Sequence, residues 1–205
     1  MKKTTESFDR LDYCLKRKPV ITSLVNKDEL PNILKSTSNI VFILKSDIIA
    51  IEAIVEQIRE AGKLSFIHFD LIDGLGKDKM GVAYAAEKIG VDGIVTTKST
   101  IITEAKKYGL MTVQRLFVFD SVSLDNGMKM TKVSGPDAIE VLPGMVCSKI
   151  MKRIRSEVDV PVIAGGLMVD LNDLETALSN GVIGISTSSK ELWDWQDANV
   201  QKVNN

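Results

Sequence analysis

The sequence predicts an α/β fold, a single (β/α)8 barrel of the TIM type. Two observations favour it: short apolar runs alternate with helical patterns eight times, and the runs recur about every 20 to 25 residues. Continuous apolar strands with short connections indicate a parallel sheet covered on both faces, and eight such strands allow the sheet to close. The alternative is a doubly wound open sheet, whose glycine-rich turn normally follows the first strand, but residues 20–24 lead to no such turn.

Length and composition fit one domain. A chain of 205 residues, 44% of them hydrophobic, can bury one substantial core, and no low-complexity stretch divides it. We expect a lead-in helix in residues 1–18, the barrel in residues 19–193, and a C-terminal tail in residues 194–205 whose polar composition is compatible with disorder.

The strands are expected where apolar and β-branched residues run together. In chain order these runs are 20–24, 40–44, 64–71, 93–97, 111–117, 138–142, and two that end within 161–167 and 182–189.

The helices are expected where apolar residues recur at helical spacing between a capping residue and a glycine. After the second strand, for example, Ile48, Ile51 and Val55 fall on one face of a helix that Ser46 or Asp47 would cap. The other helices are expected at 7–17, 27–34, 78–89, 99–109, from 120 onward, 146–158 and 170–179.

The last two strands end in residues that can hold an anion. Gly165 and Gly166 follow one apolar run, and Ser186, Thr187 and Ser188 follow the next, at a potential helix start. Bare backbone N–H groups, hydroxyl donors and a positive helix end favour a phosphate, and in an eightfold barrel such a site follows strands seven and eight. The plainer alternative is a tight turn at the glycines and an ordinary helix cap at the hydroxyl residues.

Charged residues also stand at the ends of the four middle strands. They are Asp70, Lys98, Arg115 and Glu140. Because alternate positions of a barrel strand face inward, placing each of them inward also places inward the residue two positions before it, and Lys45 reaches toward the same mouth. Such a ring can bind ligand hydroxyls, close the barrel as an ion-pair layer, or act in catalysis, with Lys98 as a Schiff-base lysine. His68, deeper in its strand, is more typical of a satisfied interior histidine.

Charge and cysteine content narrow the function classes. With 26 Lys and Arg against 27 Asp and Glu, any contact with nucleic acid must use a local basic surface. Cys14 and Cys147 have neither metal-ligand nor disulfide-framework spacing, so we expect no metal site. No apolar run reaches the roughly 18 residues of a membrane span, and the first residues lack a secretory signal, so we expect a cytoplasmic protein with no membrane partner.

Five blocks of the sequence carry a family resemblance. They are 67–76 (IHFDLIDGLG), 90–98 (GVDGIVTTK), 140–144 (EVLPG), 164–167 (AGGL) and 186–193 (STSSKELW). In this order they resemble the glycerol-3-phosphate-responsive antiterminator family, the regulators of glycerol uptake operons in bacteria. The resemblance extends from about residue 15 to Trp193.

The resemblance implies a sensor and not an enzyme. Such a barrel would bind glycerol 3-phosphate as its effector, with no cofactor, and in that state bind the leader mRNA of glycerol-utilisation operons and prevent premature termination of transcription. By analogy, the phosphate would be held by Gly165, Gly166, Thr187 and Ser188. Our own extension, from strand parity, assigns the glycerol hydroxyls and the charge balance to Asp70, Lys98, Arg115 and Glu140.

The best local basic candidate for the RNA surface is the helix at 146–158; a second is 16–18 (KRK), and Lys77 with Lys79 flank the loop after the third strand. Lys149, Lys152 and Arg153 are three and four residues apart and share one helix face, with Arg155 nearby. The alternative is that these residues are only the solvated side of a barrel helix. Trp193 and Trp195 could stack on unpaired bases or pack under the last helix. Because no RNA-binding module is visible, a homodimer that joins two modest basic surfaces is an attractive hypothesis.

An enzyme is the rival hypothesis. An aldolase, an isomerase or a glyceryl-phosphate prenyltransferase could use the same phosphate site for a phosphorylated three-carbon or sugar-like substrate, with Lys98 or Glu140 as the reacting group. A phosphate in the barrel would fit either function and would not distinguish them.

Overall fold

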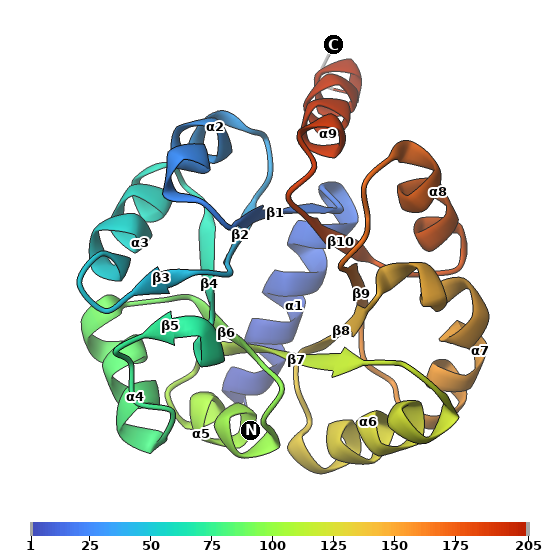
Figure 1. The fold of residues 1–205 in the computed structure, drawn as a ribbon, viewed down its shortest axis with the longest axis horizontal. Helices are drawn as coiled ribbons and strands as arrows, with labels where there is room; N and C mark the ends of the chain where they lie inside the picture. Colours follow the sequence, from blue (N-terminus) through green and yellow to red (C-terminus); the bar gives the residue numbers. More distant parts are fainter. Residues whose placement is uncertain (1, 204–205) are drawn as a thin grey trace.

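The computed structural model describes residues 2–203 and confirms the closed (β/α)8 barrel (Figure 1). Eight parallel strands form the barrel: β1 (Val20–Leu24), β2 (Ile40–Ile43), β4 (Leu64–His68), β6 (Gly93–Thr96), β7 (Met111–Phe117), β8 (Ala138–Leu142), β9 (Val162–Gly165) and β10 (Gly184–Thr187). Each strand pairs with its neighbours in chain order, and β1 also pairs with β10, which closes the ring.

The helices surround the barrel as one outer layer (Figure 1). They are α2 (Leu30–Lys35), α3 (Ile51–Glu60), α4 (Lys79–Tyr84), α5 (Ser99–Lys107), α6 (Ser121–Ser134), α7 (Cys147–Glu157), α8 (Leu171–Ser179) and α9 (Lys190–Val203), preceded in the chain by α1 (Lys2–Arg17). Short helical turns are η1 (Lys27–Glu29), η2 (Phe69–Leu71), η3 (Ala85–Ile89) and η4 (Gly144–Val146).

Local sequence signals explain where three of the helices begin. The side chains of Asp78, Asp120 and Asp170 accept hydrogen bonds from the first-turn amides of α4, α6 and α8, as N-cap residues do. At the other end of η3, Gly90 adopts φ +70°, a left-handed conformation that stops the helix.

The segment after β2 differs from the expected helix start. Ser46 and Asp47 form a two-residue strand, β3, that pairs with β5 (Ile72–Asp73). The Asp47 carboxylate accepts hydrogen bonds from the amides of Ile49 and Ala50, so the chain turns there before α3 begins at Ile51. The prediction of a helix capped at Ser46 or Asp47 was therefore wrong by one turn.

The small β3–β5 sheet also explains why the third barrel strand is shorter than expected. Strand β4 ends at His68, and the chain turns through η2 before β5, whereas the sequence suggested one strand over 64–71. This difference decides where Asp70 lies, because Asp70 is in the turn and not in the strand.

The barrel interior is apolar at the end from which the strands start. Helix α1 crosses behind the barrel (Figure 1), and its Leu11 and Leu15 are buried in one cluster with inward residues of the strands, among them Phe42 and Phe66. Burial of these leucines stabilises the closed end by the hydrophobic effect. The interior therefore has an apolar floor.

Helix α9 continues beyond the boundary expected at Trp193. Its Gln196 accepts a hydrogen bond from the amide of Val20 at 2.7 Å, and its Asp197 accepts from the amide and hydroxyl of Thr37. Residues 194–199 are thus tied to the start of the barrel, while residues 204 and 205 of the expected tail lie outside the described residues. Within residues 2–203, no helix is both long and apolar enough to cross a membrane.

Candidate functional site

The main cavity is a half-open hollow of about 560 Å³ at the carboxyl ends of the strands. In a parallel barrel this is the end at which ligands bind. Its lining comes from β1, β2, β7, β8 and the loops after β9 and β10: Ser23, Leu44, Arg115, Glu140, Leu142, Gly166, Leu167, Met168, Val169, Ser186, Thr187, Ser188 and Ser189.

A buried ion pair forms the floor of the main cavity. The Arg115 Nε donates to Glu140 Oε2 at 2.6 Å, and these side chains are 9% and 0% exposed. The other carboxylate oxygen of Glu140 accepts from the hydroxyl of Ser186. Both carboxylate oxygens are thus satisfied, whereas the terminal nitrogens of Arg115 have no hydrogen-bond partner among the described residues. The guanidinium therefore leaves a cationic fork for a ligand.

Gly165 leaves the space that the buried side chains of Glu140 and Ser186 occupy. A Cβ atom at residue 165 would lie 2.4 Å from Glu140 Oε1 and 2.6 Å from Ser186 Oγ, so a side chain there would displace the buried network. The sequence reading assigned Gly165 to a close approach of backbone and phosphate. In the structure Gly165 ends β9 and is not among the residues that line the main cavity, and its small size is required by the two side chains beside it.

The two loops of the predicted phosphate site are tied together. The Thr187 hydroxyl donates to the carbonyl of Met168 at 2.7 Å and accepts from the amide of Ser189, and the Ser189 hydroxyl donates to the carbonyl of Val169. The Thr187 hydroxyl is thereby engaged within the protein. It fixes the position of the loops instead of presenting a free donor.

Gly166 and Ser188 keep donors available. Gly166 lines the main cavity at φ +69°, and its carbonyl accepts from the amide of Gly144. Ser188 is exposed at the cavity lip, beside the start of α9. The backbone N–H groups of both residues make no hydrogen bond to the described part of the chain. These two amides and the Ser188 hydroxyl can therefore bind an anion.

The four charged residues form two separate pairs and not one ring. Strand parity correctly placed Arg115 and Glu140 inward, because Val113 and Ala138 on the same strands belong to the interior cluster. Asp70 and Lys98 instead form an ion pair of 3.2 Å, and neither lines the main cavity.

The parity prediction for Lys98 was wrong for a simple reason. Val95 of β6 is in the interior cluster, so Thr96 points outward and Lys98 is not carried to the inner face. The Thr96 hydroxyl donates to Asp70 at 2.6 Å. Burial raises the pKa of Asp70, but the bonds from Thr96 and Lys98 outweigh it, so the pKa lies below its ordinary value.

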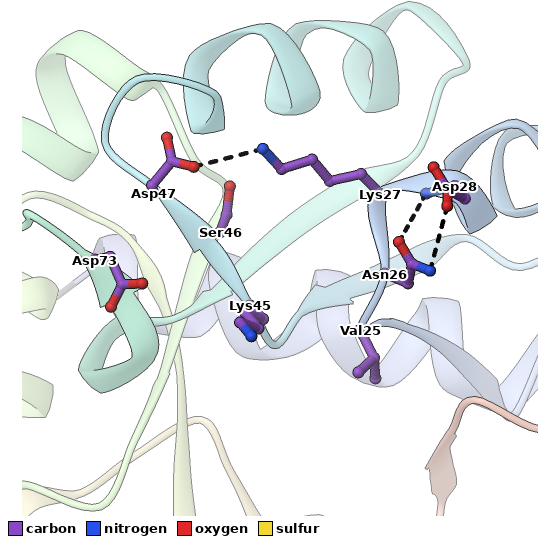
Figure 2. Close-up of a pocket in the computed structure, with 8 residues that line it drawn as sticks. All are labelled: Val25, Asn26, Lys27, Asp28, Lys45, Ser46, Asp47 and Asp73. Carbon is purple, nitrogen blue, oxygen red and sulfur yellow. Dashed lines mark hydrogen bonds and ion pairs between the residues drawn. The ribbon is translucent and has the colours of Figure 1, made fainter.

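Lys45 faces a second hollow, the rim cavity, of about 500 Å³ (Figure 2). Its polar groups largely bond one another: Lys27 is paired with Asp47 at 3.4 Å, and the Asn26 side chain bonds Asp28. The side chains of Lys45, Ser46 and Asp73 make no hydrogen bond or ion pair with the described residues, so the rim cavity keeps some free polar groups, but Lys45 is not in the lining of the main cavity.

His68 lies at the inner face of β4 and is 4% exposed. Burial and the neighbouring charge of Arg115 lower its pKa to about 4, and Asp70 opposes this only in part. Its Nδ1 is buried without a hydrogen-bond partner. The histidine is thus interior, as expected, and neutral near pH 7, but the expectation of a satisfied histidine was wrong because Nδ1 has no partner among the described residues.

The basic candidates on α7 are only partly free. Arg153 is paired with Asp125 of α6, and Arg155 donates to the carbonyl of Gly181. Lys149 and Lys152 are exposed and take part in no ion pair of the described residues. Trp193 is 4% exposed and donates to the carbonyl of Thr187, so it packs under α9 and offers no stacking surface.

No cluster of three or more potential metal ligands occurs within residues 2–203. Cys147 is buried, which raises the pKa of its thiol to about 12, and it belongs to the apolar core. Neither observation points to metal or thiol chemistry at the main cavity.

The fold and the main cavity define a (β/α)8 barrel with a cavity, lined by polar and apolar side chains, at the carboxyl ends of its strands. The family model described as glycerol-3-phosphate responsive antiterminator matches residues 20–193, and the chain therefore belongs to that family.

Relatives support this assignment. An uncharacterized protein of Escherichia coli K12, YgcP, is 33% identical over 181 residues, which cover 88% of this chain and 94% of that protein. The crystal structure of a glycerol uptake operon antiterminator regulatory protein from Listeria monocytogenes is similar with a TM-score of 0.81 and 30% identity, over 85% of this chain and 94% of that one.

An antiterminator-related protein from Thermotoga maritima is similar with a TM-score of 0.77 and 34% identity, over 86% of this chain and 98% of that one. A deoxyribose phosphate aldolase from Aeropyrum pernix has a TM-score of 0.68 but only 15% identity, over 96% and 97% of the chains, and so shares the fold alone.

The buried ion pair gives a stability prediction. Replacing Arg115 by Met should lower the free energy of unfolding by about 3 to 5 kcal/mol, because Glu140 is left charged and unpaired, while R115M/E140M should recover most of the loss. Urea unfolding at pH 7 measures both. Lys132→Met, which breaks the exposed Lys132–Glu157 pair, serves as the control and should cost less than about 1 kcal/mol. A single variant no weaker than this control would contradict the prediction.

The single histidine gives a pH prediction. A base whose pKa falls from 6.5 in the unfolded chain to about 4 in the folded protein binds more protons when unfolded, so its contribution is complete above pH 6.5 and is lost as the pH falls toward 4. Between pH 7.5 and 5 the parent should lose roughly 2 kcal/mol more than His68→Gln. Urea unfolding at the two pH values measures this difference, and an imidazole NMR titration with a midpoint near 6.5 would contradict it.

Proposed function

We propose that this protein binds glycerol 3-phosphate in the main cavity and, in that state, binds the leader mRNA of a glycerol-utilisation operon and prevents premature termination. Membership of the responsive antiterminator family supports the effector and the regulatory class. The observation that carries the ligand assignment is that Arg115, whose terminal nitrogens have no partner among the described residues, lines the same cavity as Gly166 and Ser188, whose amides make no hydrogen bond to that part of the chain.

The phosphate fits the side of the cavity formed by the last two strands. The amides of Gly166 and Ser188, the Ser188 hydroxyl and the positive end of α9 supply donors, and Arg115 supplies a cation. Thr187 contributes by tying the two loops in the geometry that brings those amides together.

The glycerol hydroxyls fit the floor. The Ser186 hydroxyl donates to Glu140 and can still accept from a ligand hydroxyl, and the terminal nitrogens of Arg115 can donate to one, so vicinal hydroxyls can be bound while the Glu140 carboxylate stays paired and balances the charge. Asp70 and Lys98 lie outside the lining, and we assign them instead to holding the rim between β4 and β6.

The link from ligand to RNA is a shift in the population of rim conformations. A ligand that bridges Gly166 and Ser188 stabilises the conformation in which both loops face the ligand. If RNA binds this conformation of the rim, the ligand strengthens RNA binding by the same free energy with which it favours that conformation. Such a regulator acts where transcripts are made, so we place it in the cytoplasm, and its association into a homodimer remains a prediction.

A regulatory function fits the cavity better than the rival enzyme. No lysine is among the residues that line the main cavity, and Lys98, the lysine proposed for a Schiff base, is paired with Asp70 away from it. The aldolase similarity is too distant in sequence to carry a reaction across. We therefore propose that the barrel senses its ligand without transforming it.

Ligand binding predicts thermal and chemical stabilisation. Glycerol 3-phosphate at one hundred times its Kd should add about 2.7 kcal/mol to the free energy of unfolding, whereas glycerol should add nothing. The effect should disappear in Gly166→Asp, because a carboxylate then faces the phosphate. Gly109→Asp is the matched control. Gly109 also has a positive φ, but it follows the C-terminal end of α5, at the end of the barrel opposite the main cavity. Equal stabilisation of both variants would remove the phosphate assignment.

RNA binding should depend on the effector. With glycerol 3-phosphate present, fluorescently labelled leader RNA should bind at least about tenfold more tightly than without it, a coupling of about 1.4 kcal/mol. Fluorescence anisotropy measures both affinities, and a scrambled RNA of equal length is the control. Equal affinity with and without the effector would refute the sensor.

A further inference from the structure

The mouth end of the barrel is unusually apolar on its outside. Among residues 10–199, whose side-chain exposure the structure describes, sixteen large hydrophobic side chains are exposed. Eleven of them lie on strand ends, the loops that follow, or the first turns after those loops: Val25, Ile48, Ile49, Leu71, Met80, Phe117, Phe119, Val122, Met145, Leu167 and Val169. Exposed apolar side chains that gather in one region of a protein surface often mark an interaction surface.

Two phenylalanines stand out in this set. Phe117 ends β7 and is 45% exposed, and Phe119 in the following loop is 81% exposed. Their rings are parallel within 2°, with centroids 6.2 Å apart, so they form an offset stack. The stack presents π surface to solvent, although a buried position would stabilise both rings more.

The stacked pair adjoins the main cavity. Phe117 follows Arg115 on the same face of β7 and is paired with Leu142 of β8, which lines the cavity. The amide of Val118, between the two rings, donates to the carbonyl of Leu142 at 2.8 Å. A ligand that engages Arg115 therefore acts on the strand that carries the aromatic pair.

Two lysines without an ion-pair partner among the described residues lie on α7, the neighbour of the helix that follows the stacked pair. Helices α6 and α7 are neighbours in the outer layer (Figure 1), and Arg153 of α7 pairs with Asp125 of α6. Lys149 lies one turn before Arg153 on the same face of α7, toward the mouth, and α6 begins two residues after Phe119. Neither Lys149 nor Lys152 is used in an ion pair of the described residues.

We infer that Phe117 and Phe119 form a base-stacking platform and that Lys149 and Lys152 contact the phosphates of the same single-stranded RNA segment. Unpaired bases stack on exposed aromatic rings whatever their sequence, and ammonium groups nearby bind the backbone. A second copy of the chain would match the apolar surface but would leave the two lysines without anions, so RNA is the occupant that the charges favour.

This inference rests on the proposed RNA-binding function, and the experiment separates the two. Full-length parent, Phe119→Leu and Phe119→Trp are titrated with labelled leader RNA at saturating glycerol 3-phosphate. Phe119→Leu keeps an apolar side chain but loses the π face, so the affinity should fall roughly 5- to 150-fold, whereas Phe119→Trp should bind as well as the parent. Lys149→Gln should reduce the salt dependence of binding by about one ion.

Controls make each outcome decisive. Val133→Ala removes an 84% exposed hydrophobic side chain at the far end of α6 and should leave RNA affinity unchanged. Stabilisation by glycerol 3-phosphate should be the same in all variants, because none of these residues lines the main cavity. Stacking should also quench the added fluorescence of Phe119→Trp when RNA binds.

Three results overturn the inference. If the parent binds leader RNA but Phe119→Leu binds equally well, the platform lies elsewhere and the proposed function stands. If Phe119→Leu instead changes the sedimentation of the protein while RNA affinity stays constant, the surface is a contact between two copies. A parent that binds no leader RNA would end both the proposed function and this inference.

Discussion

The ion pair between Arg115 and Glu140 is the constraint on which the rest of the site depends. A carboxylate with no exposed surface requires compensation for both oxygens, and it obtains this from one guanidinium nitrogen and one serine hydroxyl contributed by two other strands. The network in turn requires a glycine at residue 165. The network thereby links β7, β8 and β10 at the point where the apolar interior changes to a polar mouth, and Arg115 lines the main cavity.

Regular strands were predictable from the sequence, and their ends were not. The runs 111–117 and 138–142 match β7 and β8, so alternation alone placed Arg115 and Glu140 on the inner face. The same alternation could not place Asp70, because the chain leaves β4 at His68 and goes on to form a second, two-stranded sheet. The position of Lys98 could not be predicted either. Val95 and Thr96 suit a strand equally well, and only contacts with distant residues decide which of them faces inward.

Aromatic residues illustrate the same limit. Trp193 and Trp195 attracted attention because tryptophan often stacks on bases, yet Trp193 is covered by the core and hydrogen-bonded to Thr187. Phe117 and Phe119 appear in the sequence as the end of an apolar strand, which is the usual context of a core residue. Their i, i+2 spacing beyond the last inward polar residue was the available signal, but exposure depends on what the neighbouring loops cover, and those loops come from other parts of the chain.

Helix α1 closes one end of the barrel interior, so that a bound ligand exchanges with solvent through the mouth. Since Leu11 and Leu15 seal the opposite end, a small molecule held on the Arg115 floor can enter and leave only past the loops that the proposed transcript would touch. RNA bound at the mouth would block this path, and the metabolite would dissociate only after the transcript had dissociated. The duration of the signal would then be set by how long the complex persists and not by the concentration of the metabolite at that moment.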